Sequence, residues 1–238
     1  MPVKIEINPE HDPVKLGEML QRDGVLQIKN FLTAKSAETI HQWLLENKTW
    51  YLAYNDGDNF YESPMAQVQQ APAQERQQLM NSIYQRATTQ FQYLFIQYYI
   101  TQAIELGEDN GHPMHEMHSW INKQSTLDFM RTLVGESAIK KADSYASCYS
   151  PGHFLTQHED HHEKHDRVAA YVISMTKVWD VNWGGHLAFY DDIGNVKQAF
   201  IPGYNCFNVF LIPQRHAVQP VASFANTNRL SYLGWLHR

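Results

Sequence analysis

Short apolar runs separated by turn residues fill the C-terminal third of the chain. They lie at 168–176, 183–190, 196–201, 205–212, 216–221 and 229–236, and the segments between them include Pro-Gly, Pro-Gln-Arg and Asn-Thr-Asn. Many short strands with regular turn signals are typical of a sandwich or a barrel. This pattern predicts a β-sheet core, and a double-sheet jelly roll fits the number of strands.

The preceding part of the chain shows mainly helical periodicity. Residues 24–28 read as a strand, and Thr33 is placed to cap a helix that runs to about residue 47. Residues 55–59 read as a turn, and 125–134 as a short helix that Gly135 stops. A long helix is predicted from Pro72 to about residue 105, with an apolar stripe formed by Leu79, Ile83, Ala87, Phe91, Leu94 and Tyr98. The aromatic run at 91–99 is expected to be core.

These patterns predict an α+β, mainly β protein in which a double-stranded β-helix is braced by N-terminal helices. At 238 residues the length suits one domain, with a helical layer at 1–142 and the β core at 143–238. The formal net charge of −6 gives no basic field for direct nucleic-acid or membrane binding. Two cysteines, no signal peptide and no long apolar run favour a cytoplasmic protein.

The segment 143–160 carries the most informative polar pattern. It reads as a strand, a Pro-Gly turn and a second strand that ends in His158-x-Asp160. Because side chains alternate along a strand, His158 and Asp160 point the same way. One imidazole and one carboxylate supply two of the three ligands of a 2-His-1-carboxylate iron site, and the third must come from far along the chain.

The same residues allow other interpretations. His161-His162-Glu163 offers a competing His-x-Glu pair, and 158–162 also fit the H-E-x-x-H pattern of zinc peptidases, with Glu159 as base. That motif needs a helix with an apolar stripe, whereas 157–167 contain no apolar residue. A solvated loop with incidental histidines, including His165, stays open as a third interpretation.

A histidine and an arginine follow on predicted strands. His216 begins one strand within the pattern His-x-Val-x-Pro, and Arg229-x-Ser231 begins the next. In this order the elements resemble the Fe(II)/2-oxoglutarate-dependent oxygenases, most closely the prolyl hydroxylase branch, over residues 143–238. The resemblance implies that His158, Asp160 and His216 bind Fe(II), and that the protein is a dioxygenase using 2-oxoglutarate and O2, with ascorbate as a possible reductant.

The resemblance also implies a co-substrate site. Arg229 would bind the distal carboxylate of 2-oxoglutarate bidentately, and Ser231 would donate to the same ligand from the same strand face. Tyr149 matches the family tyrosine that faces the co-substrate, and Tyr171 is a second candidate. Where some prolyl hydroxylases place another co-substrate tyrosine, this chain has Ser174.

The expected substrate is a prolyl residue of a protein, bound as an extended peptide under the polar loop at 161–167. A free amino acid or another small metabolite is the alternative substrate, and a non-catalytic jelly-roll metal-binding protein is the alternative class. Trp183 and His186 are candidates for the mouth of the site. His112, His115 and His118 are interpreted as surface histidines of a loop in preference to a metal cluster. The sequence predicts no oligomeric state.

Overall fold

The computed structural model describes residues 4–160 and 166–238. Within them the helices are α1 (Pro13–Asp23), α2 (Ala34–Glu46), α3 (Met65–Gln70), α4 (Ala73–Ala87), α5 (Ile100–Leu106), α6 (His115–Ile121) and α7 (Gln124–Val134), with a 3-10 turn η1 (Val181–Trp183). The strands are β1 (Val25–Lys29), β2 (Tyr51–Asp56), β3 (Asn59–Pro64), β4 (Tyr93–Tyr98), β5 (Lys141–Ala142), β6 (Tyr145–Tyr149), β7 (Phe154–His158), β8 (Arg167–Met175), β9 (Leu187–Tyr190), β10 (Val196–Phe200), β11 (Tyr204–Leu211), β12 (His216–Val218) and β13 (Arg229–His237).

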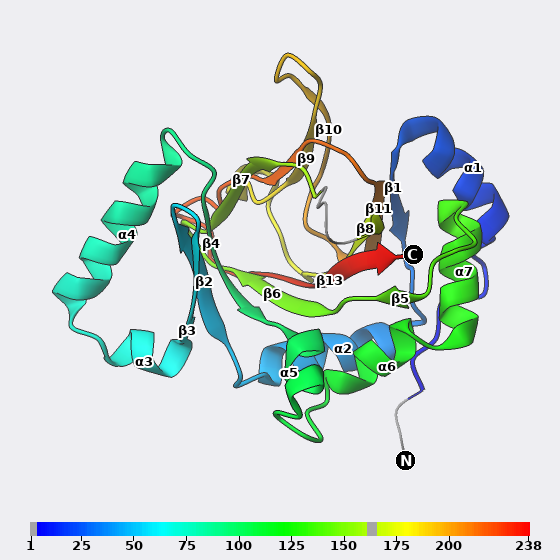
Figure 1. Ribbon diagram of the computed structural model, residues 1–238, viewed down its shortest axis with the longest axis horizontal. Coiled ribbons are helices and arrows are strands. Elements are labelled where there is room, and N and C mark those ends of the chain that lie inside the picture. Colours follow the sequence, from blue (N-terminus) through cyan, green and yellow to red (C-terminus); the bar gives the residue numbers. More distant parts are fainter. Residues whose placement is uncertain (1–3, 161–165) are drawn as a thin grey trace.

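The strands form one antiparallel sheet that rolls up on itself. Its order is β1-β11-β8-β13-β6-β4-β7-β12-β9-β10, with the β2–β3 hairpin added beside β4. Strands β7, β12, β9 and β10 therefore lie opposite the larger half of the sheet (Figure 1). This is the predicted double-stranded β-helix, and the fold class expected from the sequence is confirmed.

Helices cover the outer face of the larger half. Helices α2, α5, α6 and α7 lie along it, with α1 packed on α7, while α3 and α4 lie beside β2 and β3 (Figure 1). The main apolar core fills the space between these helices and the sheet, with Ile40, Met117 and Leu133 facing Tyr171 and Phe207. No helix in the described residues is long and apolar enough to cross a membrane.

A second apolar cluster lies inside the roll. It joins Ala170 and Val172 of β8 and Phe210 of β11 to Leu187 and Phe189 of β9 across the interior. We call the side of β8, β11, β13 and β6 that faces this interior the inner face. This apolar packing holds the two halves of the sheet together. It therefore also fixes the positions of polar side chains that lie next to the cluster on the same strands.

Local signals set the ends of the helices. The Asp12 side chain caps α1 by accepting from the main-chain N–H groups of Val14 and Lys15. Thr33 caps α2 through the N–H of Ser36, and Gly135 ends α7 in a left-handed conformation, both as predicted.

The predicted long helix from Pro72 to about residue 105 was wrong. Helix α4 ends at Ala87, β4 occupies Tyr93–Tyr98, and α5 follows. Strand β4 pairs with β2, β6 and β7, so long-range pairing overrides a stripe that also fits helical spacing. As a result Leu94 and Tyr98 are buried, whereas Phe91 is 43% exposed.

Candidate functional site: a His-Asp-His cluster and a buried arginine

Two histidines and an aspartate meet at one end of the roll. His158 ends β7, His216 begins β12, and the two residues are paired in the register of these strands. Nε2 of His158 lies 3.5 Å from Oδ1 of Asp160, and Nε2 of His216 lies 3.5 Å from Oδ2. One ligand atom from each residue lies within 4.8 Å of the other two, so the cluster could hold a metal ion.

The main chain fixes which ring nitrogen of each histidine faces the aspartate. Nδ1 of His158 is 3.0 Å from the carbonyl oxygen of Thr156, and Nδ1 of His216 is 2.9 Å from that of Gln214. A carbonyl only accepts, so each Nδ1 carries the proton and each Nε2 presents a lone pair. Metal-ligating imidazoles are commonly oriented in this way.

The charges of the cluster suit a divalent transition metal. Burial and the neighbouring His158 lower the pKa of His216 to about 4, so its ring is neutral near pH 7. Burial alone would raise the pKa of Asp160, but the polar surroundings that His158 and His216 provide outweigh it and lower that pKa. Neutral imidazoles with one carboxylate are the donor set of non-haem Fe(II) sites.

Arg229 is a buried cation at the start of β13. Its side chain lies over the Tyr149 ring, 5.1 Å from the centroid, and Arg229 is only 4% exposed. Burial lowers its pKa, and its Nε has no hydrogen-bond partner among the described residues. A buried charge without a partner is costly, so this environment fits an anionic ligand.

A row of serine hydroxyls lies beside Arg229 on the inner face. Ser231 is in register with Ser147 of β6 and with Ser174 of β8, so the three side chains point to the same side. The hydroxyls of Ser147 and Ser231 are buried and lack partners in the described part of the chain, while that of Ser174 accepts from Gly203 N–H at 3.2 Å. The sequence analysis missed Ser147, although it lies two residues before Tyr149 and therefore on the same strand face.

The two candidate tyrosines lie on opposite faces. Tyr149 is in register with Arg229 on the inner face, stacks on Phe95 at 5.0 Å, and has its pKa raised by burial. Tyr171 is in register with Gly234, belongs to the main core, and donates its hydroxyl to the carbonyl of Asp143 at 2.6 Å. The structure therefore places Tyr171 on the face of the sheet opposite Arg229.

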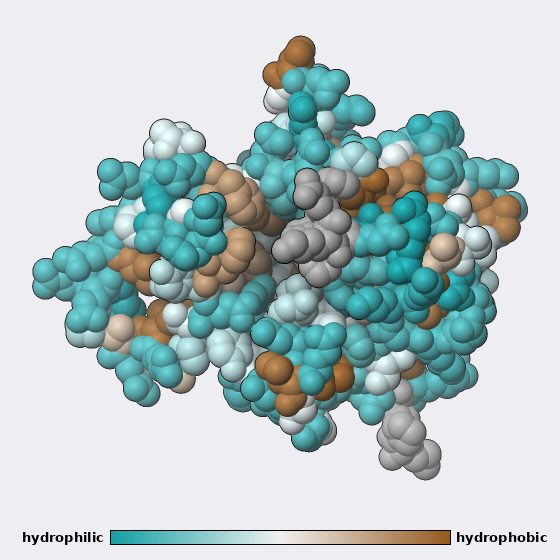
Figure 2. Space-filling view, in the orientation of Figure 1, coloured by the Kyte–Doolittle hydropathy of each residue, from teal (hydrophilic) through white to brown (hydrophobic). Residues whose placement is uncertain are grey.

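Aromatic side chains surround the approach to the cluster. Phe91, Tyr93 and Phe95 stand one after another along β4 and its lead-in, with ring centroids 5.9 and 5.5 Å apart, and Phe91 lies 5.5 Å from the His158 ring. Trp179 and Trp183 pack with Tyr149. Apolar surface gathers over the positions of β4 and β7, while most of this face is hydrophilic (Figure 2). Phe91 and its neighbours thus face the site, not the core as the sequence suggested.

Other candidate residues have separate outcomes. His186 is half-buried, and burial together with the charge of Arg229 lowers its pKa, which indicates that it lies near Arg229. His112, His115 and His118 form no metal-binding group with the described acidic or sulfur ligands; they are half-buried and hydrogen-bonded to Asn47, Tyr98 and Ser144. His158 lies on a strand, not on the helix that H-E-x-x-H requires, and His161, His162 and His165 lie outside the described residues.

A family model matches the part of the chain that carries the candidate site. Residues 144–237 match the model of the 2OG-Fe(II) oxygenase superfamily. Among proteins with curated descriptions, none matches the chain in sequence.

Solved structures share the fold at low sequence identity. A Pseudomonas putida prolyl-4-hydroxylase is 17% identical with a TM-score of 0.58, over 95% of this chain and 99% of that one. A Trichoplax adhaerens prolyl hydroxylase in complex with a hypoxia inducible factor peptide is 16% identical with a TM-score of 0.62, over 94% and 90%. A Burkholderia pseudomallei oxidoreductase of the 2OG-Fe(II) oxygenase family is 14% identical with a TM-score of 0.60, over 98% and 93%. The chain is therefore similar in sequence to the 2OG-Fe(II) oxygenase superfamily over residues 144–237, and similar in fold to prolyl hydroxylases over most of its length.

Proposed function

We propose that His158, Asp160 and His216 hold Fe(II), and that Arg229, Ser231 and Tyr149 bind 2-oxoglutarate. The observation that carries the proposal is the convergence of two Nε2 lone pairs and one carboxylate in a fold that also buries a guanidinium whose Nε has no hydrogen-bond partner among the described residues. The donor set fits Fe(II), and the unpartnered atoms of Arg229 and Ser231 fit a carboxylate. Strands of 1–142 pair with strands of 143–238, which supports one catalytic domain.

The reaction that this site supports is hydroxylation of an unactivated C–H bond. Bound Fe(II) with 2-oxoglutarate and O2 supplies the oxidation, and 2-oxoglutarate leaves as succinate and carbon dioxide. Arg229 holds the distal carboxylate in a fixed place, and Ser231 adds a hydrogen bond to it. The apolar cluster of the roll excludes water from this end, while Phe91 and Phe95 form one wall beside which the substrate enters.

We infer that the prime substrate is a prolyl residue in an extended peptide. A fold relative was solved with a hypoxia inducible factor peptide bound, and the approach here is open and aromatic. A rigid ring costs little entropy to position against aromatic side chains. A small molecule is the second candidate, because a 2-oxoglutarate-dependent epimerase of nogalamycin biosynthesis also has this fold, with a TM-score of 0.54.

The metal assignment is tested by Fe(II) binding under anaerobic conditions. His216→Ala should lower Fe(II) affinity at least tenfold, because one of three ligands is lost. His162→Ala, the matched control, should bind Fe(II) as the wild type does. If His162→Ala abolished binding while His216→Ala did not, the zinc-peptidase interpretation would replace this one.

The substrate assignment is tested by mass spectrometry of lysate proteins treated with the enzyme, Fe(II), 2-oxoglutarate and ascorbate. A gain of one oxygen on a specific proline, with formation of succinate, would support a protein substrate. Oxidation of a free metabolite, with no modified peptide at good coverage, would reject it. The Arg229→Met protein serves as the control for oxidation that does not depend on 2-oxoglutarate.

A further inference from the structure

The inner face continues beyond the roll onto strands β4, β2 and β3. Phe95 of β4 stacks on Tyr149 and is in register with Ala53 of β2. Ala53 is in turn in register with Glu62 of β3. Paired residues of neighbouring strands point to the same side of a sheet, so Glu62 lies on the side that faces the candidate site, beyond the small Ala53 side chain. Because side chains alternate along a strand, Phe60 lies on this side as well.

This surface is rich in aromatic side chains and partly open to solvent. Phe60 is 73% exposed. Tyr93 lies on the same side of β4 as Phe95, with ring centroids 5.5 Å apart, and is half-buried. We call Phe60, Glu62, Tyr93 and Phe95 the β3–β4 surface. Large exposed aromatic side chains that gather beside a substrate approach are typical of a surface that binds a partner.

Glu62 gives the β3–β4 surface a negative charge that no cation of the chain neutralises. Its carboxylate accepts a hydrogen bond from the neutral side chain of Gln97, and it forms no ion pair with any residue in 4–160 or 166–238. Burial, together with the negative charge of Glu62, raises the pKa of Tyr93 to about 12, which indicates that the carboxylate lies near this ring. The surface therefore combines one carboxylate with several aromatic rings.

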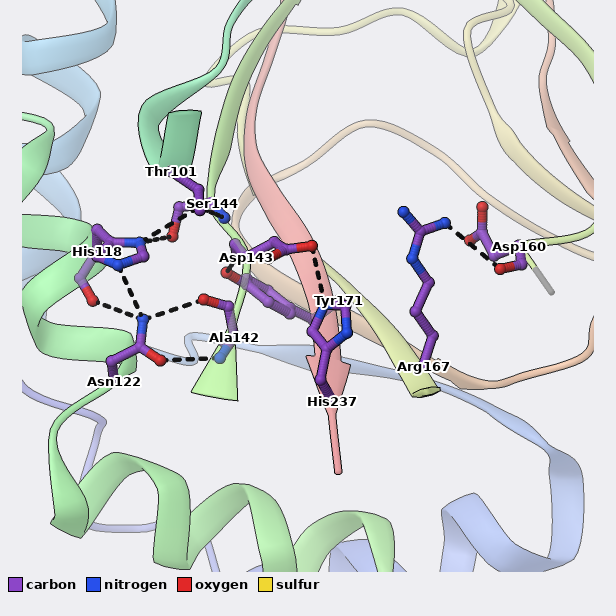
Figure 3. Close-up of polar contacts among 10 residues, drawn as sticks. All are labelled: Thr101, His118, Asn122, Ala142, Asp143, Ser144, Asp160, Arg167, Tyr171 and His237. Carbon is purple, nitrogen blue, oxygen red and sulfur yellow. Dashed lines mark hydrogen bonds and ion pairs between the residues drawn. The ribbon is translucent and has the colours of Figure 1, made fainter. Parts of the chain in front are cut away.

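The arginines around the site have other positions and partners. Figure 3 shows the Arg167 side chain reaching toward Asp160, whose main-chain carbonyl oxygen lies 3.5 Å from Nη1. Arg86 of α4 lies 3.4 Å from a carboxylate oxygen of Asp56. Arg229 is buried at the proposed co-substrate site. The charge of Glu62 is therefore left for a cation that the substrate brings.

Strand spacing sets the distance between Glu62 and the wall of the site. Neighbouring strands lie about 4.8 Å apart, so two spacings separate Glu62 from Phe95 by roughly 10 Å, which about three residues of an extended peptide span. We propose that Glu62 selects an extended peptide with a lysine or arginine about three residues from the residue that is hydroxylated, and that this cationic side chain packs on Phe60 and Tyr93. A cation is attracted both by an exposed carboxylate and by the faces of aromatic rings. The inference rests on the proposed function and specifies its substrate class.

The test measures binding of labelled peptides by fluorescence anisotropy to the whole chain with Mn(II) and 2-oxoglutarate, in the absence of O2. Three peptides share a central proline in a serine–glycine background and differ only at the third position on either side, which is lysine, glutamine or glutamate. The wild type should bind the lysine peptide about fivefold more tightly than the glutamate peptide at low ionic strength, and added salt should reduce this preference. Glu62→Gln should abolish the preference, and Glu62→Lys should reverse it. Glu18→Gln, the matched control, removes an exposed carboxylate on α1, which lies on the other side of the molecule from β3 (Figure 1), and should keep the wild-type preference.

Thermal unfolding of each variant establishes that it is folded before its affinities are compared. Equal affinity of the wild type for the three peptides would overturn the inference, and so would a preference for lysine that survives in Glu62→Lys. An equal loss of preference in Glu18→Gln would also overturn it, because the effect would then come from the net charge alone. Failure of His216→Ala to weaken Fe(II) binding would instead reject the proposed metal site, so the two failures can be told apart.

Discussion

Arg229 carries a positive charge in a part of the protein that excludes water. Its Nε has no hydrogen-bond partner in the residues described, and the guanidinium lies over the face of the Tyr149 ring. A ligand carboxylate would offset the cost of burying this charge, and the guanidinium would bind it bidentately. The same reasoning explains why the buried hydroxyls of Ser147 and Ser231 lack hydrogen-bond partners within residues 4–160 and 166–238.

Arg229→Met should therefore lose affinity for 2-oxoglutarate while it keeps Fe(II). Truncating one partner of a desolvated charge pair typically costs about 2–5 kcal/mol, which corresponds to a fall of tens to thousands of fold. Calorimetry with metal present measures this directly. Arg131→Met, which removes an arginine on α7, should bind 2-oxoglutarate normally, and wild-type affinity in Arg229→Met would remove Arg229 from the site.

His153 predicts how stability depends on pH. Burial lowers its pKa to about 4 in the folded protein, below the ordinary value of 6.5. The unfolded chain therefore takes up the proton first, and the free energy of unfolding falls as pH drops from about 6.5 to about 4, by up to about 3 kcal/mol from this group. Urea unfolding across that range should show a weaker pH dependence for His153→Gln; an unchanged dependence would contradict the assignment.

At the scale of elements, the positions of the strands in the C-terminal third could be predicted from the sequence. Which side of each strand faces the interior of the roll could not. Strand β8 is buried on both sides, so its sequence carries no polar alternation that could show which way Tyr171 points. Strand β4 was predicted as helix because its aromatic residues also satisfy helical spacing, and only pairing with β2, β6 and β7 decides between the two.

The candidate metal ligands could be predicted because the sequence itself shows how they are arranged on their strands. His158 and Asp160 lie on one strand and are related by simple alternation, and His216 and Arg229 begin strands that turn residues mark clearly. Ser147 was missed because its position beside Ser231 depends on cross-strand register, which one sequence does not show.

Gly234 gives a prediction at this scale. Its Cβ would meet the Asp143 carbonyl at 2.0 Å and the Tyr171 hydroxyl at 2.9 Å, both in rigid surroundings. Gly234→Ala should lower the free energy of unfolding by about 3 kcal/mol or prevent folding. Gly111→Ala has open space around its Cβ and a positive φ, so it should cost only about 1 kcal/mol. Similar unfolding midpoints in urea would contradict the close approach.

At the scale of the whole molecule, the rolled sheet carries both groups of candidate site residues on its strands. The short strands β7 and β12 bring the His-Asp-His cluster to one end of the interior, and β13 buries Arg229 against β6. We propose that these residues form one site, in which the metal ion and the 2-oxo acid are bound together. Chelation of the 2-oxo acid by the metal should therefore make its binding depend on the metal.

The most direct test is anaerobic calorimetric titration of 2-oxoglutarate into the protein with and without Fe(II). Wild-type protein should bind 2-oxoglutarate at least tenfold more tightly with Fe(II) present, and His216→Ala should lose that enhancement while it remains folded. Equal affinity with and without Fe(II), or an undiminished enhancement in His216→Ala, would contradict the account.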